Sequence, residues 1–112
     1  MKTALAIVFV MLSTTIPALA ETMTAAEIEA ELIGKTLCVK NKQNQNICVR
    51  HKVGGVSEVV SGPELQTGVW RFKGNKHCTK WQKIRAGKEF CSNFEKYGSS
   101  YSNSFSGKIT LK

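Results

Sequence analysis

Hydrophobic residues are spaced in three different ways along the chain. Residues 4–12 form an unbroken apolar run, residues 21–33 carry apolar side chains four positions apart, and from residue 35 onward apolar and polar residues alternate. Residues at i and i+4 lie on one face of a helix, whereas alternation with a period of two is typical of a β-strand. The pattern therefore predicts one short helix followed by a β-rich region.

The helix is predicted over residues 21–33. Thr24 and Glu27 fit a capping box, in which the threonine caps the N-terminus and the glutamate reaches back to it. Ile28 and Leu32 form a narrow apolar stripe. A stripe of this width indicates that the helix lies against a larger structure.

Two alternating runs, residues 37–40 and 47–53, predict a first hairpin that is joined by the polar loop 41–46. A turn centred on this loop sets Cys38 opposite Cys48, on the face that the apolar residues do not use. This register would allow a local disulfide between the two cysteines.

Two further hairpins are predicted in the second half of the chain. Their strands are expected at residues 67–73, 76–83 and 88–96, with turns at Gly74-Asn75 and around Arg85-Ala86-Gly87. A Gly-Asn pair between two alternating runs is a good signal for a two-residue hairpin turn. One face of these strands would gather the aromatic residues, and we expect it to pack beneath the helix. This face consists of Trp70, Phe72, His77, Thr79, Trp81 and Phe90.

The opposite face of the second hairpin follows from pairing Lys73 with Lys76. Arg71, Cys78 and Lys80 would share that face. The next strand can then place Cys91 across from Cys78, which makes Cys78–Cys91 the preferred second disulfide.

The C-terminal part alternates less clearly. Residues 98–107 contain five serines and are expected to be a loop or a poorly paired strand, whereas residues 108–112 alternate as a closing strand. We therefore expect a mainly β fold of six or seven short strands, arranged as a small antiparallel meander or a barrel-like curved sheet. The short N-terminal helix would cap this sheet, and disulfides would staple it.

The first twenty residues have the order of a secretory signal. Lys2 precedes the apolar run at 4–12, and small residues stand at Ala18 and Ala20. The apolar run is shorter than the ~20 residues that cross a bilayer as a helix. Residues 1–20 are therefore predicted to be a cleavable signal peptide, and residues 21–112 a single exported domain.

The four cysteines, Cys38, Cys48, Cys78 and Cys91, all lie in the exported part. An even number of cysteines in an oxidising compartment favours disulfides. A four-thiolate zinc site usually brings its cysteines in close pairs, and no C-x-x-C pair occurs here. Two disulfides are predicted, and the spacing alone leaves their connectivity open.

Five short motifs occur in a characteristic order. They are Thr-Ala-Ala-Glu-Ile at 24–28, Leu-Ile-Gly-Lys-Thr at 32–36, Gly-Val-Trp-Arg at 68–71, Cys-Thr-Lys-Trp at 78–81 and Gly-Lys-Glu-Phe-Cys at 87–91. In this order the chain resembles a family of small exported proteobacterial proteins that share a domain of unknown function. The resemblance implies a periplasmic β-rich protein with a bridged Cys78–Cys91 hairpin, and it carries over no catalytic residue. Cys38 and Cys48 are not part of the shared pattern.

The charge is unevenly distributed. The chain has a formal net charge of +8, but residues 33–112 hold fifteen lysines and arginines against four glutamates, while residues 21–31 carry four glutamates and no basic residue. Such a surface attracts anions. The basic residues expected to form an anion-binding surface around the two later hairpins are Lys73, Lys76, Lys80, Lys83, Arg85 and Lys88.

Catalytic side chains are scarce. The chain has no aspartate, its eight glutamates lie at the helix or are scattered, and its cysteines are expected in disulfides. His51 and His77 could ligate a metal only if their strands met, and His77 is expected to be exposed or half-packed beside its turn. We therefore predict that the protein is not an enzyme and has neither a cofactor nor a metal site.

These features favour a non-enzymatic periplasmic binding or envelope-associated protein, whose partner is an anionic envelope polymer or an acidic protein. Nucleic acid is disfavoured as a partner because it is scarce in a periplasm. One alternative is a secreted protein inhibitor or host-directed effector that uses a contact loop near Tyr97 and Tyr101. A minor alternative is a haem or metal carrier using His51 or His77.

Overall fold

The structure of the protein is a computed structural model that describes residues 19–112. The predicted signal peptide lies outside these residues, apart from Leu19 and Ala20. The helical elements are α1 (Ala25–Glu31) and the short 3-10 turn η1 (Ile84–Gly87). The strands are β1 (Glu21–Thr22), β2 (Thr36–Lys40), β3 (Asn46–His51), β4 (Val56–Ser61), β5 (Thr67–Lys73), β6 (Lys76–Trp81), β7 (Phe90–Ser92), β8 (Phe94–Tyr97), β9 (Ser100–Asn103) and β10 (Gly107–Leu111).

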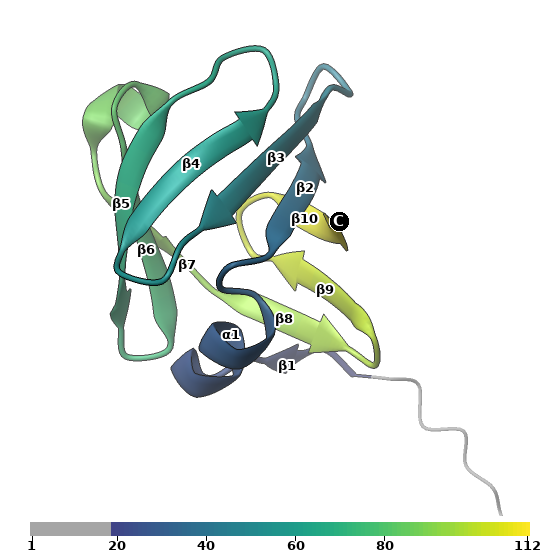
Figure 1. The fold of residues 1–112 in the computed structure, drawn as a ribbon. Coiled ribbons are helices and arrows are strands. Elements are labelled where there is room, and N and C mark those ends of the chain that lie inside the picture. The colour runs from purple at the N-terminus through teal and green to yellow at the C-terminus, as the bar shows by residue number, and fades with distance from the viewer. Residues whose placement is uncertain (1–18) are drawn as a thin grey trace, which may run out of the picture.

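The strands form one antiparallel sheet in the order β1-β8-β9-β10-β2-β3-β4-β5-β6-β7. Only Asn93 separates β7 from β8, yet β7 pairs with β6 while β8 pairs with β9. The last strand of this order, β7, is thus joined by a single residue to β8, the second strand of the order, and the sheet curls into a half-barrel. Figure 1 shows α1 at one end of this half-barrel and the β2–β3 turn at the other.

The predicted hairpin registers are confirmed. Lys73 lies opposite Lys76, and Cys78 lies opposite Cys91. Both predicted disulfides are present, Cys38–Cys48 with a Cα–Cα distance of 4.0 Å and Cys78–Cys91 with 3.9 Å. Two disulfides place the folded domain in an oxidising compartment outside the cytoplasm.

The helix predicted over residues 21–33 was too long at both ends, since α1 begins at Ala25 and ends at Glu31. The capping box is formed as expected, because Thr24 Oγ1 accepts a hydrogen bond from the Glu27 backbone N–H and the Glu27 carboxylate accepts one from the Thr24 N–H. The extended backbone of an N-cap residue ends the helix there, so Glu21 and Thr22 instead form β1 against β8. In the part of the chain that the structure describes, no helix is long and apolar enough to cross a membrane.

Two strands differ from the sequence prediction: β9 is better paired than expected, and β3 is shorter at its C-terminal end. The serine-rich segment contains β9, which pairs with β8 and β10 along its length. The inward positions of β9 are occupied by Tyr101 and Asn103. Because these side chains are polar, the sequence shows no clear alternation of apolar and polar residues. The predicted strand 47–53 ends at His51, because Lys52 enters the tight turn to β4 and Val53 is exposed.

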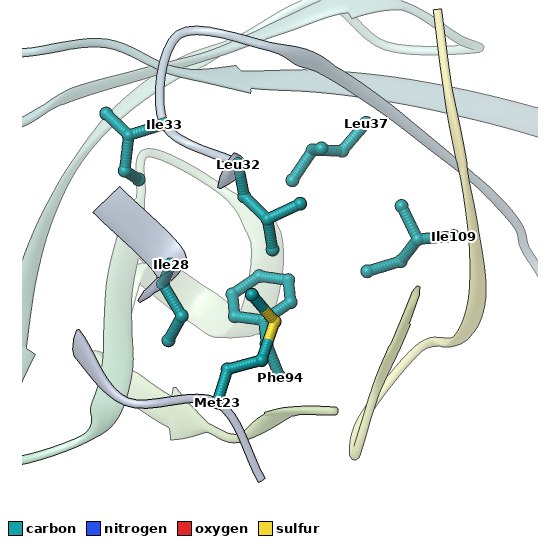
Figure 2. Packing of buried hydrophobic residues seen from close by; sticks show 7 residues of the cluster. All are labelled: Met23, Ile28, Leu32, Ile33, Leu37, Phe94 and Ile109. Atoms are coloured by element: carbon teal, nitrogen blue, oxygen red, sulfur yellow. The ribbon is translucent and has the colours of Figure 1, made fainter. Parts of the chain in front are cut away.

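The hydrophobic core lies between α1 and the concave face of the sheet (Figure 2). Met23 precedes the helix and packs with Ile28 and Leu32, so both staple residues of the capping box are buried. The sheet adds Leu37, Phe94 and Ile109 from three different strands. The helix therefore closes one end of the half-barrel.

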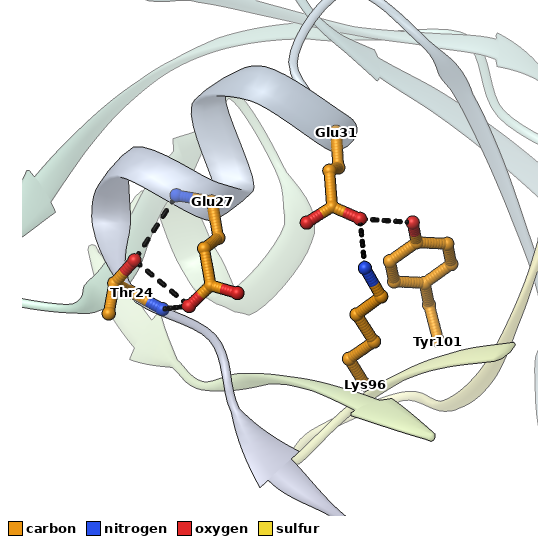
Figure 3. A network of polar contacts seen from close by, with 5 residues as sticks. All are labelled: Thr24, Glu27, Glu31, Lys96 and Tyr101. Carbon is orange, nitrogen blue, oxygen red and sulfur yellow. Dashed lines mark hydrogen bonds and ion pairs between the residues drawn. The ribbon is translucent and has the colours of Figure 1, made fainter. Parts of the chain in front are cut away.

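Polar contacts fix the helix on this end (Figure 3). The Glu31 carboxylate accepts hydrogen bonds from Lys96 Nζ at 2.5 Å and from the Tyr101 hydroxyl at 2.7 Å. These contacts lower the pKa of Glu31 and raise that of Lys96, chiefly through the hydrogen bond between them. The last turn of α1 is thereby tied to β8 and β9.

Candidate functional site

A pocket of about 500 Å³ lies on the concave side of the half-barrel. Most of its wall is aliphatic or aromatic, with side chains from β2, β3, β6, β7, β8 and β10. Leu37, Phe94 and Ile109 belong to both the wall and the hydrophobic core. The core beneath the helix therefore closes the pocket at that end.

The other end of the pocket is bordered by turns, and we call it the rim. The rim consists of Lys40, Asn41, Lys42, Ile84, Phe105 and Ser106. Lys40 and Lys42 are exposed. The wall and rim residues of the described chain include these two lysines and no carboxylate, so the electrostatic potential at the rim is positive.

Arg85 adds a third cation beside the rim. Its guanidinium lies 3.8 Å from the ring centre of Phe105 and 4.8 Å from that of Phe90, two rings that line the pocket. Gln66 positions this segment, because its side-chain oxygen accepts hydrogen bonds from the backbone N–H groups of Lys83 and Ile84. A cation over an aromatic face is a favourable arrangement.

Two histidines form the most polar part of the pocket wall. The expectation that His77 is exposed or half-packed is wrong, since its side chain is 2% exposed and that of His51 is 5% exposed. The ring centres lie 4.3 Å apart. His77 points inward because it lies on the same face of the β5–β6 hairpin as the aromatic residues. The Trp70 ring stacks on it, with 5.2 Å between the ring centres.

Both imidazoles are neutral near pH 7. Burial lowers the pKa of His77 to about 4, and burial together with the nearby His77 lowers the pKa of His51 to about 3. Nδ1 of His51 shares a hydrogen bond of 2.6 Å with Ser57 Oγ, and Nδ1 of His77 shares one of 3.3 Å with Thr79 Oγ1. Within residues 19–112, Nε2 of His77 is the buried side-chain polar atom that has no hydrogen-bond partner.

The six basic residues singled out from the sequence have different surroundings. Lys73, Lys76 and Lys80 are exposed on the convex side of the β5–β6 hairpin. Lys83 pairs with Glu64 at 2.9 Å, Arg85 stacks beside the rim, and Lys88 follows η1. The strand pairing thus separates a convex basic face from the cations near the pocket.

The two tyrosines also have different surroundings. The Tyr101 side chain turns inward and bonds Glu31, so it supports the helix rather than a contact loop. Tyr97 is 39% exposed and borders a shallow hollow among the serines of β9.

A cluster of potential metal ligands lies outside the pocket. Cys78, Cys91 and Glu89 come close together, but the two sulfurs form a disulfide, and Glu89 makes a bidentate pair with Arg71. This cluster therefore offers no free thiolate for a metal.

Sequence reasoning missed the pocket, although one signal for it was present. His77 and Thr79 lie between Phe72 and Trp81 on the face predicted to be aromatic, and a polar pair on such a face indicates either a polar core or a binding site. The meeting of His77 with His51 depends on the curl of the sheet, which brings β3 and β6 together across the concave side.

Comparisons with protein-family models, with curated proteins and with solved structures found no match to this chain.

Proposed function

We propose that the protein is a non-enzymatic binding protein that holds a small amphiphilic molecule in the half-barrel pocket. The apolar part of the ligand lies against the pocket wall, and its anionic group lies at the rim. The observation that carries this proposal is an apolar pocket closed at its inner end by the core and bordered at its outer end by lysines.

The size and lining of the pocket support this function. Pockets for small molecules usually have volumes of about 300 to 1,000 Å³ and mostly apolar walls with a few polar groups. The wall here combines Val39, Val49 and Trp81 with two histidines and a threonine. Burial of apolar ligand surface, worth about 25 cal/mol per Å², supplies the binding energy.

The rim supports an anionic group on the ligand. Lys40 and Lys42 face no carboxylate in the lining, and Arg85 lies close by. An anion bound at this place stays near water, so its desolvation cost is small. The charge of the chain led us to expect an anionic partner. The proposed ligand is also anionic, but it is a small molecule rather than a polymer or a protein.

Fluorescence of Nile red, a neutral apolar dye, tests the pocket. The dye should bind the wild-type protein, and dodecanoate should displace it. Val39→Trp fills the pocket and should abolish binding, whereas Val69→Trp adds the same side chain on the convex side, where Val69 is exposed, and should leave binding intact. Equal binding by both variants would rule out the pocket as the site.

Charge removal tests the rim. Lys40→Gln with Lys42→Gln should weaken dodecanoate binding several-fold and leave Nile red binding unchanged, because only the fatty acid carries a charge. The matched control is Lys73→Gln with Lys76→Gln, which removes the same charge from the convex face. An equal effect of both double variants would show that only the net charge matters.

The convex basic face favours a second function, the recognition of an anionic envelope polymer or an acidic protein. Lys73, Lys76 and Lys80 are exposed, and the neighbouring Glu89 is already engaged by Arg71. We expect salt-sensitive retention on an anionic polymer, which should be lost when these three lysines are changed to glutamate. Unchanged retention after that reversal would exclude this face.

We also propose that the protein is exported to the periplasm and is related to the family of small exported proteins that it resembles. Residence in the periplasm follows from the predicted signal peptide together with the disulfides, and the resemblance to small exported proteins agrees with it. The inhibitor or effector alternative remains a prediction, for which Tyr97 is the contact residue still exposed.

A further inference from the structure

The rim of the pocket exposes apolar side chains among its cations. Ile84 is 37% exposed and Phe105 is 58% exposed, and both belong to the rim. We infer that the rim docks onto the surface of an anionic lipid bilayer, with these two side chains in the headgroup layer and the rim cations on lipid phosphates. The partner is a membrane, which goes beyond the proposed binding of a small molecule.

The protein holds Phe105 in its exposed position. The Asn103 side-chain oxygen accepts hydrogen bonds from the backbone N–H groups of Phe105, at 2.8 Å, and Ser106, at 3.3 Å. Asn103 is itself buried, and its side-chain nitrogen donates to Ser92 Oγ. In residues 19–112, Phe105 has the largest exposed fraction of any aromatic side chain. A ring exposed to this extent gains free energy when it enters an apolar environment.

The short turn η1 presents the second part of the rim in a strained conformation. Arg85 and Ala86 both have a φ of 55°, in the left-handed region that disfavours residues other than glycine. Hydrogen bonds to the buried Gln66 side chain hold the start of this turn. Ile84 consequently lines the pocket while the Arg85 guanidinium lies 3.8 Å from the ring centre of Phe105. The turn therefore brings an apolar side chain and a cation to the same border of the pocket.

The cations at this border are available to phosphates. Within residues 19–112, Lys40, Lys42 and Arg85 make no ion pair. Lys83 beside them is already paired with Glu64. Each lysine or arginine near an anionic membrane surface strengthens binding about five-fold, and salt weakens this attraction. The rim thus combines exposed apolar side chains with cations that lack a partner in the described chain.

A bilayer fits both parts of this surface better than an acidic protein does. The headgroup layer offers phosphates to the cations and, at the acyl boundary, an apolar environment to Phe105 and Ile84. The carboxylates of an acidic protein would match the cations alone. On the basis of the proposed function, docking also sets the pocket opening against the membrane, so an amphiphilic ligand passes between the bilayer and the pocket without crossing water.

Flotation with lipid vesicles tests the docking. The exported chain should float with vesicles of phosphatidylcholine and phosphatidylglycerol in equal parts, and not with vesicles of phosphatidylcholine alone. Ile84→Ser with Phe105→Ser should lower the vesicle affinity at least about five-fold, because the apolar contact is lost. Lys40→Gln with Lys42→Gln should lower it to at least the same extent, because two phosphate contacts are lost.

A matched control removes two exposed apolar side chains elsewhere. Val53→Ser with Val56→Ser changes the β3–β4 connection, at the opposite end of β3 from the β2–β3 turn, and should bind vesicles as the wild type does. Phe105→Trp should gain fluorescence that is quenched by phosphatidylglycerol with brominated acyl chains, whereas the fluorescence added by Val53→Trp should not be quenched. Both are measured as differences from the wild type, because Trp70 and Trp81 also fluoresce.

The outcomes separate the docking from the proposed function. Absence of flotation with anionic vesicles overturns the inference, and so does flotation that Lys73→Gln with Lys76→Gln abolishes while the rim variants retain it. Dodecanoate binding that persists in either case leaves the proposed function standing. Flotation that depends on Phe105, together with quenching of Phe105→Trp, supports the docking even if dodecanoate does not bind.

Discussion

The most unusual residues of this protein are two histidines buried in an otherwise apolar wall. The Nδ1 atom of each forms a hydrogen bond with a neutral hydroxyl group, that of Ser57 for His51 and that of Thr79 for His77. Protonation would place a positive charge on a buried ring, and the pocket lining offers no carboxylate to balance it. The histidines therefore couple the stability of the fold to pH.

Acid should destabilise the protein at a pH well above the usual range of carboxylate titration. Both folded-state pKa values, about 4 for His77 and about 3 for His51, lie below the ordinary value of 6.5. As the pH falls below about 6.5, the histidines become protonated in the unfolded chain but stay neutral in the folded chain. The free energy of unfolding therefore falls by up to about 1.4 kcal/mol per pH unit for each histidine. Urea unfolding at several pH values between about 7.5 and 5 measures this slope.

A variant separates the histidines from other groups. In His77→Phe the slope over the same pH range should be about half that of the wild type, whatever the change in absolute stability. Glu31 and Glu89 have pKa values lowered from 4.5, so their contributions are lost only at a lower pH. A wild-type stability that is constant from neutral pH to about 5 would contradict the assignment of buried neutral histidines.

At the scale of elements, the two disulfides have the same design. Each joins residues directly opposite each other in a hairpin, Cys38 with Cys48 and Cys78 with Cys91. Because these residues alternate with the residues that line the pocket, neither bridge occupies the pocket wall. The β2–β3 bridge stabilises the hairpin whose turn carries Lys42.

Removing the β2–β3 bridge should affect both stability and ligand binding. Cys38→Ser with Cys48→Ser opens a short loop and should lower the free energy of unfolding by about 2–4 kcal/mol. Dodecanoate affinity should also fall, because Lys40 and Lys42 lose their fixed place at the rim. Cys78→Ser with Cys91→Ser is the control: a similar loss of stability with unchanged dodecanoate affinity is expected. If both double variants lost the same dodecanoate affinity, the rim would not depend specifically on the β2–β3 disulfide.

The elements show what could be predicted from the sequence. Hairpin registers and disulfides are local consequences of turn position and a period of two, so Gly74-Asn75 was enough to place Lys73 opposite Lys76. β4 was not predicted, and the segment of β9 was expected to be a loop or a poorly paired strand. Serines in both strands and a glutamate in β4 weaken the alternation of apolar and polar residues. The pocket brings together residues of β2 and β3 with residues of β6 to β10, and such long-range proximity depends on the curl of the sheet, which no local pattern encodes.

The half-barrel as a whole depends on its C-terminal strand. β10 joins β9 to β2, and without it the strand order would separate into a β1-β8-β9 group and a β2-to-β7 group. Its Ile109 also belongs to the core cluster that contains Leu37 and Phe94 (Figure 2). The curled sheet therefore depends on residues 107–112 to connect its two groups of strands.

Deleting residues 107–112 should abolish cooperative folding. The deletion removes two strand pairings and a core side chain, which together exceed what a small domain can lose. Circular dichroism during thermal unfolding should show a broad change without a sharp midpoint. Removal of Lys112 alone breaks one backbone hydrogen bond to Thr36 and should cost about 1 kcal/mol or less. A sharp transition in the longer deletion would show that the curl closes without β10.

The position of the helix has a consequence for how this protein could change over evolutionary time. Because α1 and the core occupy one end of the half-barrel, the turns at the other end carry little of the folding energy. Insertions or substitutions in the β2–β3, β6–β7 and β9–β10 turns would therefore be tolerated, and each would reshape the opening. Descendants of one ancestor could thus acquire different ligands on an unchanged framework, and the same turns are where a designer would begin.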